Sequence, residues 1–145
     1  TPPKSCSEQI KRFWFKEAVK QDKNTADAYR GIGIACWEQK EYKAALKAFK
    51  KAVKAGTKEN ATLYNLMGGC ALKLDDGKSA LSYYEKGLAA SGSSDELKKE
   101  MEYNVIVSYE KMQNWEKAKS KLNEYLEKYP DDETAKKEVE FLETR

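Results

Sequence analysis

The chain has 145 residues, of which 27 are basic and 24 acidic, so its formal net charge is +3. A charge this small gives little general attraction to nucleic acid or to anionic membranes. The sequence contains no histidine, which excludes Ser-His-Asp and Cys-His catalysis and histidine-ligated metal sites.

The first predicted helix covers residues 6–21, and Ser5 with Glu8 has the spacing of a capping box at its start. This helix carries Phe13 and Trp14, two large apolar side chains that need a neighbour. They dock either another copy of the chain or a missing part of a longer array. Alternatively, residues 1–5 fold back over them, or Trp14 packs on the next helix. The residues leave both readings open.

Six further helices are predicted at 25–39, 42–55, 60–74, 78–91, 95–112 and 115–129, with no strand between them. Tight turns are expected at Lys40-Glu41, Asp75-Asp76-Gly77 and Gln113-Asn114. We expect Ser93, with Glu96, to cap the helix over 95–112. An eighth helix over 132–143 follows Asp131-Asp132. It carries an apolar face of Ala135, Val139 and Leu142 and an opposite polar face of Lys136, Lys137, Glu138, Glu140 and Glu143.

Small and large side chains recur in register along the chain. Ala45, Ala80 and Ala118 are 35 and 38 residues apart, which is the period of helical-hairpin repeats. Further matching sets are Gly33 with Gly68, Tyr29 with Tyr64, Phe49 with Tyr84 and Leu122, and Phe15, Ala18 and Val19 with Phe49, Ala52 and Val53. Gly77 replaces an aromatic residue, which predicts a looser second hairpin. Ile106 and Tyr125 replace small residues and predict a slightly wider third hairpin.

This pattern resembles the tetratricopeptide repeat family, and the style of the third copy resembles bacterial members. The resemblance implies an all-α fold, an α-solenoid of antiparallel helical hairpins wound as a right-handed superhelix. The expected organisation is a single domain over 1–145: a half repeat at 6–24, full repeats at 26–59, 61–94 and 99–132, and a capping helix at 132–143.

The resemblance also implies that the first helix of each hairpin lines a concave groove that binds a peptide or protein. The groove positions carried onto this sequence are Arg30, Ile34, Trp37, Asn65, Leu72, Lys73, Tyr103, Asn104, Val107 and Lys111. Trp37 is read either as a groove residue or as part of the core. The clamp of Lys and Asn residues with which some relatives bind a C-terminal carboxylate is not reproduced, because Ile34 and Leu66 stand where Asn is required.

These observations predict a non-enzymatic protein–protein interaction module without cofactor or metal. The expected partner is a protein or peptide, with no nucleic acid and no membrane insertion, and the chain is expected to be a monomer or a weak homo-oligomer. The alternative is an assembly segment of a longer array that docks through Phe13 and Trp14.

The three cysteines are Cys6, Cys36 and Cys70, and their odd number and wide spacing do not suggest a disulfide framework. Cys36 and Cys70 lie in apolar stretches and are interpreted as small buried hydrophobic residues. Free cysteines favour a cytoplasmic location. An exported or lipid-anchored protein remains the alternative if an upstream signal was removed.

Overall fold

A computed structural model describes residues 9, 12–13, 25–56 and 60–145, and all regular structure among them is helical. The chain divides into two compact units, residues 1–59 and 60–145, and each unit is considered by itself. From residue 25 onward, the described part of the chain has seven helices, and each corresponds to a predicted helix. The predicted helix over 6–21 and Trp14 lie outside the described residues, apart from Gln9, Arg12 and Phe13.

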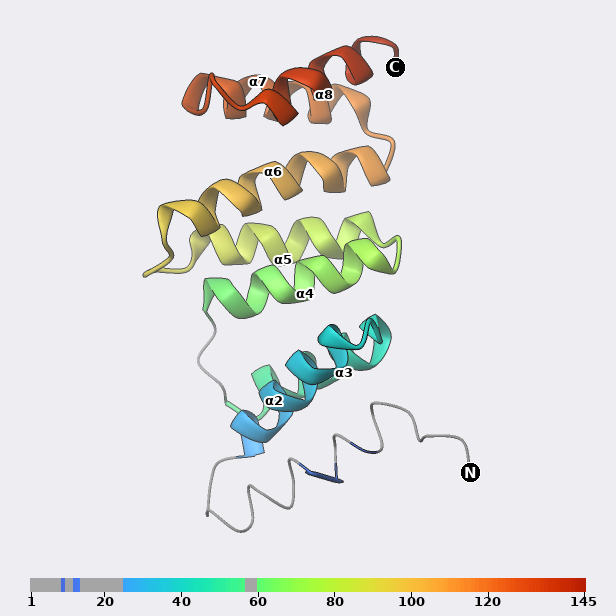
Figure 1. Ribbon diagram of the computed structural model, residues 1–145, viewed down its shortest axis with the longest axis vertical. Coiled ribbons are helices and arrows are strands. Elements are labelled where there is room, and N and C mark those ends of the chain that lie inside the picture. Colours follow the sequence, from blue (N-terminus) through green and yellow to red (C-terminus); the bar gives the residue numbers. More distant parts are fainter. Residues whose placement is uncertain (1–8, 10–11, 14–24, 57–59) are drawn as a thin grey trace. The chain divides into compact units, whose positions relative to one another are not determined.

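The first unit contains one described hairpin, formed by α2 (Thr25–Glu38) and α3 (Tyr42–Lys54), which lie side by side in Figure 1. Fully buried Ala45 and Ala52 line the side of α3 that faces α2. The ring of Phe49 fills the interface between them. A Cβ atom at Gly33 would lie 2.5 Å from Cδ1 of this ring, so a glycine is required for this approach of the two helices.

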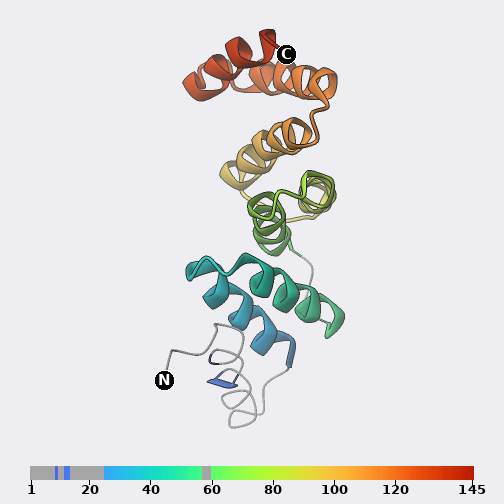
Figure 2. The same ribbon diagram turned by 90° about the vertical axis from the view of Figure 1, so that its right-hand side faces the viewer.

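The second unit consists of α4 (Ala61–Lys73), α5 (Gly77–Ala89), α6 (Asp95–Lys111), α7 (Trp115–Lys128) and α8 (Glu133–Glu143). Each helix packs on the next one along the chain, and α4 also contacts α6 (Figure 2). One core cluster, around Tyr84 and Met101, joins α4, α5 and α6. A second cluster, around Ile106 and Leu122, joins α6, α7 and α8.

The turns inside the three hairpins are built in the same way. Lys40, Asp75 and Gln113 have positive φ angles of 62°, 61° and 58°. The amide that follows each of them donates to a carbonyl five residues earlier: Glu41 to Cys36, Asp76 to Ala71 and Asn114 to Tyr109. This pattern is the Schellman motif. Three identical turns at the repeat spacing confirm the predicted tight turns and the phase of the repeat.

Replacing Gln113 with glycine is expected to stabilise the second unit by about 0.5–1 kcal/mol, because glutamine is disfavoured at positive φ. Thermal unfolding followed by circular dichroism measures the effect. The neighbouring Asn114 caps α7 by accepting from the amide of Lys117 at 3.2 Å. Asn114→Ala should therefore lower stability by about 1 kcal/mol. A lower melting temperature for Gln113→Gly would contradict the assigned turn.

The residue that caps α6 differs from the prediction. Ser94, and not Ser93, caps α6, because its hydroxyl accepts from the amide of Leu97 at 3.1 Å. The hydroxyl of Ser93 is buried and has no hydrogen-bond partner. Asp132 caps α8 as predicted. It accepts from the amide of Ala135 and also from the hydroxyl of Tyr125, which ties α7 to the start of α8.

At the contact between its two helices, the third hairpin carries a different pair of side chains from the second hairpin. In the second hairpin, Gly68 accommodates the ring of Tyr84, whereas in the third Ile106 faces the smaller Leu122. The side chains of Tyr84, Ile106 and Leu122 are each at most 2% exposed. Bulk added on one helix is thus matched by bulk removed on the other, which explains how Ile106 fits.

Gly77 is buried against α6, which the prediction of a loose hairpin did not anticipate. A Cβ atom at this position would lie 2.8 Å from the carbonyl oxygen of Ser108 and 2.9 Å from Cβ of Lys111. The missing side chain therefore lets the start of α5 approach the end of α6 closely.

The two described cysteines differ in state. Cys70 is a buried free thiol, and burial raises its pKa to about 12. Cys36 is fully buried but disulfide-bonded, so the interpretation as a simple hydrophobic residue is wrong for Cys36. A pairing between distant segments depends on tertiary contacts, and the spacing of the cysteines does not reveal it.

Candidate functional site

Predicted groove residues of the second unit lie on adjoining faces of α4 and α6. The side-chain amide nitrogen Nδ2 of Asn65 on α4 donates to Oε1 of Glu100 on α6 at 3.4 Å. The ammonium group of Lys111, at the end of α6, pairs with Asp75, just after α4, at 3.3 Å. These two polar contacts connect α4 with α6 near both ends of α6.

Between these contacts the face is half-buried and mixed in character. Leu72 packs against the core cluster but keeps part of its surface exposed, and Val107 and Asn104 are also half-buried. Oδ1 of Asn65 is shielded from solvent and has no hydrogen-bond partner among the residues that the structure describes. A buried amide oxygen without a donor is energetically costly. The face therefore combines an orphaned buried acceptor with half-buried apolar surface.

The side of α6 toward α8 holds a carboxylate pair. Glu138 on α8 lies near Tyr103 and Glu110, both on α6, and raises the pKa of each. Burial, together with the nearby charge of Glu138, raises the pKa of Tyr103 to about 12. Burial and the neighbouring carboxyl group of Glu138 raise the pKa of Glu110 to about 8. The sequence placed Glu138 on the solvent side of its helix, which is wrong.

The free energy of unfolding of the second unit is expected to fall as the pH rises from about 5 to about 9. The pKa of Glu110 in the folded chain, about 8, lies above its ordinary value of 4.5, so folding binds a proton between these values. The resulting stabilisation is complete below about pH 4.5 and disappears as the pH passes about 8. Because solvent screens this half-buried group, the effect is limited to about 1 kcal/mol.

Melting temperatures recorded across this pH range test the prediction. Glu110→Gln should flatten the decline, whereas Glu140→Gln, an exposed position on α8, should keep the slope of the unmodified chain. Equal slopes for all three proteins would contradict the carboxylate pair.

The remaining predicted groove residues belong to the first unit or are exposed. Ile34 is 36% exposed, and Trp37 is half-buried with its ring edge-on to Tyr42, at 5.2 Å between centroids. Arg30 is half-buried, and Lys73 is exposed. That Arg30, Ile34 and Trp37 extend the α4–α6 face stays a prediction.

The proposed assembly position Phe13 is 55% exposed, and its neighbour Trp14 lies outside the described residues. The use of these two residues in assembly likewise stays a prediction.

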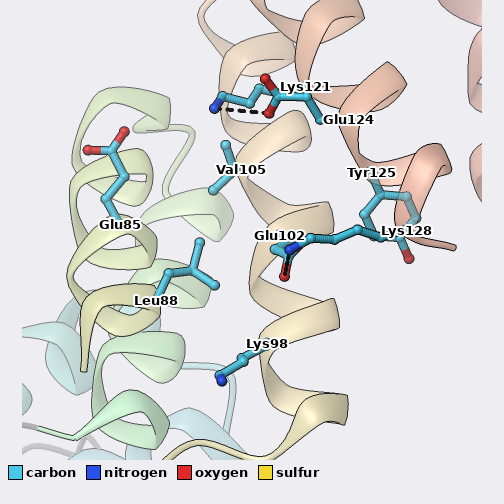
Figure 3. A pocket seen from close by; sticks show the side chains of 9 residues that line it. All are labelled: Glu85, Leu88, Lys98, Glu102, Val105, Lys121, Glu124, Tyr125 and Lys128. Atoms are coloured by element: carbon cyan, nitrogen blue, oxygen red, sulfur yellow. Dashed lines mark hydrogen bonds and ion pairs between the residues drawn. The ribbon is translucent and has the colours of Figure 1, made fainter. Parts of the chain in front are cut away.

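A cavity of about 420 Å³ lies between α5, α6 and α7 (Figure 3). Its apolar lining comes from Leu88, Val105 and Tyr125, and charged side chains surround this lining. Lys128 pairs with Glu102 at 3.1 Å, and Lys121 pairs with Glu124 at 3.3 Å. No sequence pattern indicated this cavity, because its rim consists of charged residues that are typical of a solvated helix surface.

This cavity and the predicted groove lie on different sides of α6. The cavity uses Lys98, Glu102 and Val105, whereas the groove prediction uses Tyr103 and Val107. At 100° per residue these two sets point in roughly opposite directions from the helix axis. The cavity and the predicted groove are therefore separate surfaces of the second unit.

Among the described residues, no cluster of acidic or cysteine side chains has the arrangement of a metal site. In the same part of the chain, no helix is long and apolar enough to cross a bilayer.

Comparison with known families explains the repeated geometry. A profile described as "Tetratricopeptide repeat" matches residues 15–60 and 42–95, which together span more than half of the chain. The chain belongs to the tetratricopeptide repeat family. Its hairpins, with a glycine or alanine at each close helix contact, are tetratricopeptide hairpins, and the fold is an all-α helical repeat. The curated proteins include no significant match to the sequence.

Solved structures of tetratricopeptide proteins are similar over most of the chain. MamA from Desulfovibrio magneticus RS-1 is 22% identical with a TM-score of 0.76, over 96% of this chain and 75% of that one. YrrB, described as having an unusual peptide-binding site, is 26% identical with a TM-score of 0.71, over 89% and 63%. The first repeat domain of Spaghetti (RPAP3), bound to an HSP90 peptide, is 18% identical with a TM-score of 0.66, over 82% and 90%.

Proposed function

We propose that this tetratricopeptide protein is a non-enzymatic interaction module that binds a peptide segment of a partner protein on the α4–α6 face. The observation that carries the proposal is the unpartnered, buried Oδ1 of Asn65 beside the half-buried Leu72. A peptide N–H group satisfies that oxygen, while an apolar peptide side chain covers Leu72 and Val107.

The carboxylate pair supplies a second point of recognition at the α8 end of this face. A lysine or arginine side chain of the peptide, placed beside Glu110 and Glu138, favours the ionised form of Glu110. The preferred ligand is therefore a segment with apolar side chains and a basic residue. The relatives that bind peptides, YrrB and the repeat domain of Spaghetti, support this class of function.

Selection of peptides from a random display library on the immobilised full chain tests the proposal. Selected peptides are then titrated, as fluorescent derivatives, into the chain and its variants. Asn65→Leu and Val107→Glu should each weaken binding by about tenfold or more, because one removes the acceptor and the other places a charge on the apolar surface.

The matched control alters the cavity on the other side of α6. Glu85→Gln with Lys98→Gln should leave the affinity within about twofold, since both side chains line only that cavity. Loss of binding in this control, with retention in Asn65→Leu, would transfer the binding function to the cavity and overturn the proposal. Circular dichroism spectra verify that each variant is folded.

Assembly through the N-terminal segment is the second candidate function, favoured by the 55% exposure of Phe13. Light scattering after size exclusion should then show an oligomer that Phe13→Ala with Trp14→Ala converts to a monomer. A strict monomer before substitution would exclude this candidate.

A further inference from the structure

Helix α3 carries a row of unneutralised lysines. Its sequence contains five lysines and no acidic residue. Lys43, Lys47, Lys50 and Lys54 are all exposed, and within the described part of the chain none of these four forms an ion pair. The fifth, Lys51, points elsewhere, with its ammonium group over the ring of Tyr29 at 5.6 Å.

The row lies on the side of α3 that faces away from its hairpin partner. Successive members are four, three and four residues apart, so all four side chains point in nearly the same direction from the helix. The buried positions Ala45, Phe49 and Ala52 point the opposite way, toward α2. The lysines therefore take no part in packing the hairpin.

The equivalent helices of the other hairpins show that the fold does not require this row. Helix α5 combines two lysines with one glutamate, and α7 combines four lysines with three glutamates. Lys121 and Lys128 of α7 are both paired with carboxylates. Lysines four residues apart repel each other by roughly 0.2–0.5 kcal/mol per pair. The row on α3 thus has a cost that is absent from α5 and that glutamates partly offset on α7.

The dimensions of the row favour a helical partner over a flat or broad polyanion. The four lysines extend over roughly 17 Å along one helix. The adjoining helix α2 carries Asp27 and Glu38 and only one basic residue, Arg30. The positive surface of this hairpin is consequently a line one helix wide, too narrow for the broad contact that a nucleic acid duplex offers.

A membrane surface fits the row less well than a helix does. The large exposed hydrophobic residues of the described chain are Phe13, Ile34, Leu74 and Phe141. None of them lies on α3, so this surface has no apolar side chain to insert between lipids. An acidic helix, in contrast, presents carboxylates with the same spacing as the lysines.

We propose that the lysine row of α3 docks an acidic α-helical segment of a partner protein whose carboxylates recur every three to four residues. This surface is separate from the α4–α6 face, and its occupant does not depend on the function proposed for that face.

Two Ala-rich helical peptides of about 20 residues and identical composition test the proposal. One carries four glutamates in a row at the spacing of the lysines, and the other carries them scattered around the helix. Fluorescence anisotropy with the full chain should show binding of the row peptide at least about tenfold tighter than the scattered one at about 50 mM salt. About 300 mM salt should weaken this binding strongly.

Two variants of equal net charge separate the row from general electrostatic attraction. Lys43, Lys47, Lys50 and Lys54 are changed to Gln in one variant, and exposed Lys78, Lys86, Lys117 and Lys137 in the other. Glutamine keeps the helix propensity of lysine. The first variant should lose row-peptide binding by about tenfold or more, while the second keeps it within about twofold.

Equal loss in both variants, or equal affinity for the two peptides, would overturn the proposal. The same anisotropy assay with a DNA duplex, and sedimentation with phosphatidylserine vesicles, test the other polyanions. Tighter row-dependent binding to the duplex or to the vesicles than to the row peptide would also overturn it.

Discussion

Gly68→Ala is expected to destabilise the second unit by about 1–3 kcal/mol, although alanine is the better helix former. The added Cβ atom would lie 2.6 Å from the ring atoms Cε1 and Cζ of Tyr84. This ring is 1% exposed and lies within the core cluster of α4, α5 and α6. Thermal or urea unfolding followed by circular dichroism measures the loss.

A double substitution based on the third hairpin tests the reason for this effect. Gly68→Ile with Tyr84→Leu copies the natural pair Ile106 and Leu122, in which two aliphatic side chains of equal size replace a glycine and an aromatic ring. The double variant should be more stable than the sum of the two single effects predicts, by about 1–2 kcal/mol.

Gly87→Ala serves as the control for added bulk alone. A Cβ atom at Gly87 would approach Sδ of Met101 at 2.5 Å. A thioether side chain is flexible enough to move away, so we expect a smaller loss than at Gly68. If the stability changes of Gly68→Ile and Tyr84→Leu simply add in the double variant, the side chains at these two positions do not compensate for each other, which would contradict the explanation.

Ala118→Trp is expected to reduce stability by about 1–3 kcal/mol or more, because overpacking displaces the core. Ala118 is fully buried in the cluster that joins α6, α7 and α8. Lys117→Trp adds the same side chain at the preceding, exposed position and should change stability by no more than about 0.5 kcal/mol. Ala45→Trp should reproduce the loss in the first unit, since Ala45 is also fully buried.

Unfolding midpoints of the three variants decide this prediction. An unchanged midpoint for both Ala118→Trp and Ala45→Trp would show that the alanine positions are not the close contacts between paired helices.

The hairpins were predictable because their packing depends on residue size at fixed spacing. Three alanines and two glycines recur in register, and only small residues permit such close helix contacts. The turns were predictable for the same reason, although the left-handed geometry at Lys40 and Gln113 has no signature in those residue types.

Features that depend on a second segment were not predictable. Glu138 looks like a solvated residue when α8 is considered alone, but it lies near Tyr103 and Glu110 on α6 and raises the pKa of both. Ser93 and Ser94 are equally suitable caps by type, and only the backbone path places the hydroxyl of Ser94 at the amide of Leu97.

The candidate face was predictable only in part. Sequence periodicity selected Asn65, Leu72, Tyr103 and Val107 on two helices that do pack together. The orphaned oxygen of Asn65 and the raised pKa of Glu110 depend on distances across helices. A binding site of this kind is defined by which polar groups lack a partner after packing, and no single helix specifies that.

Mapping a selected peptide on the isotope-labelled chain by two-dimensional NMR tests the central claim most directly. Binding on the proposed face predicts the largest amide shifts at Asn65, Leu72, Tyr103 and Val107. Shifts confined to the residues around Leu88 and Tyr125, on the other side of α6, would contradict the account.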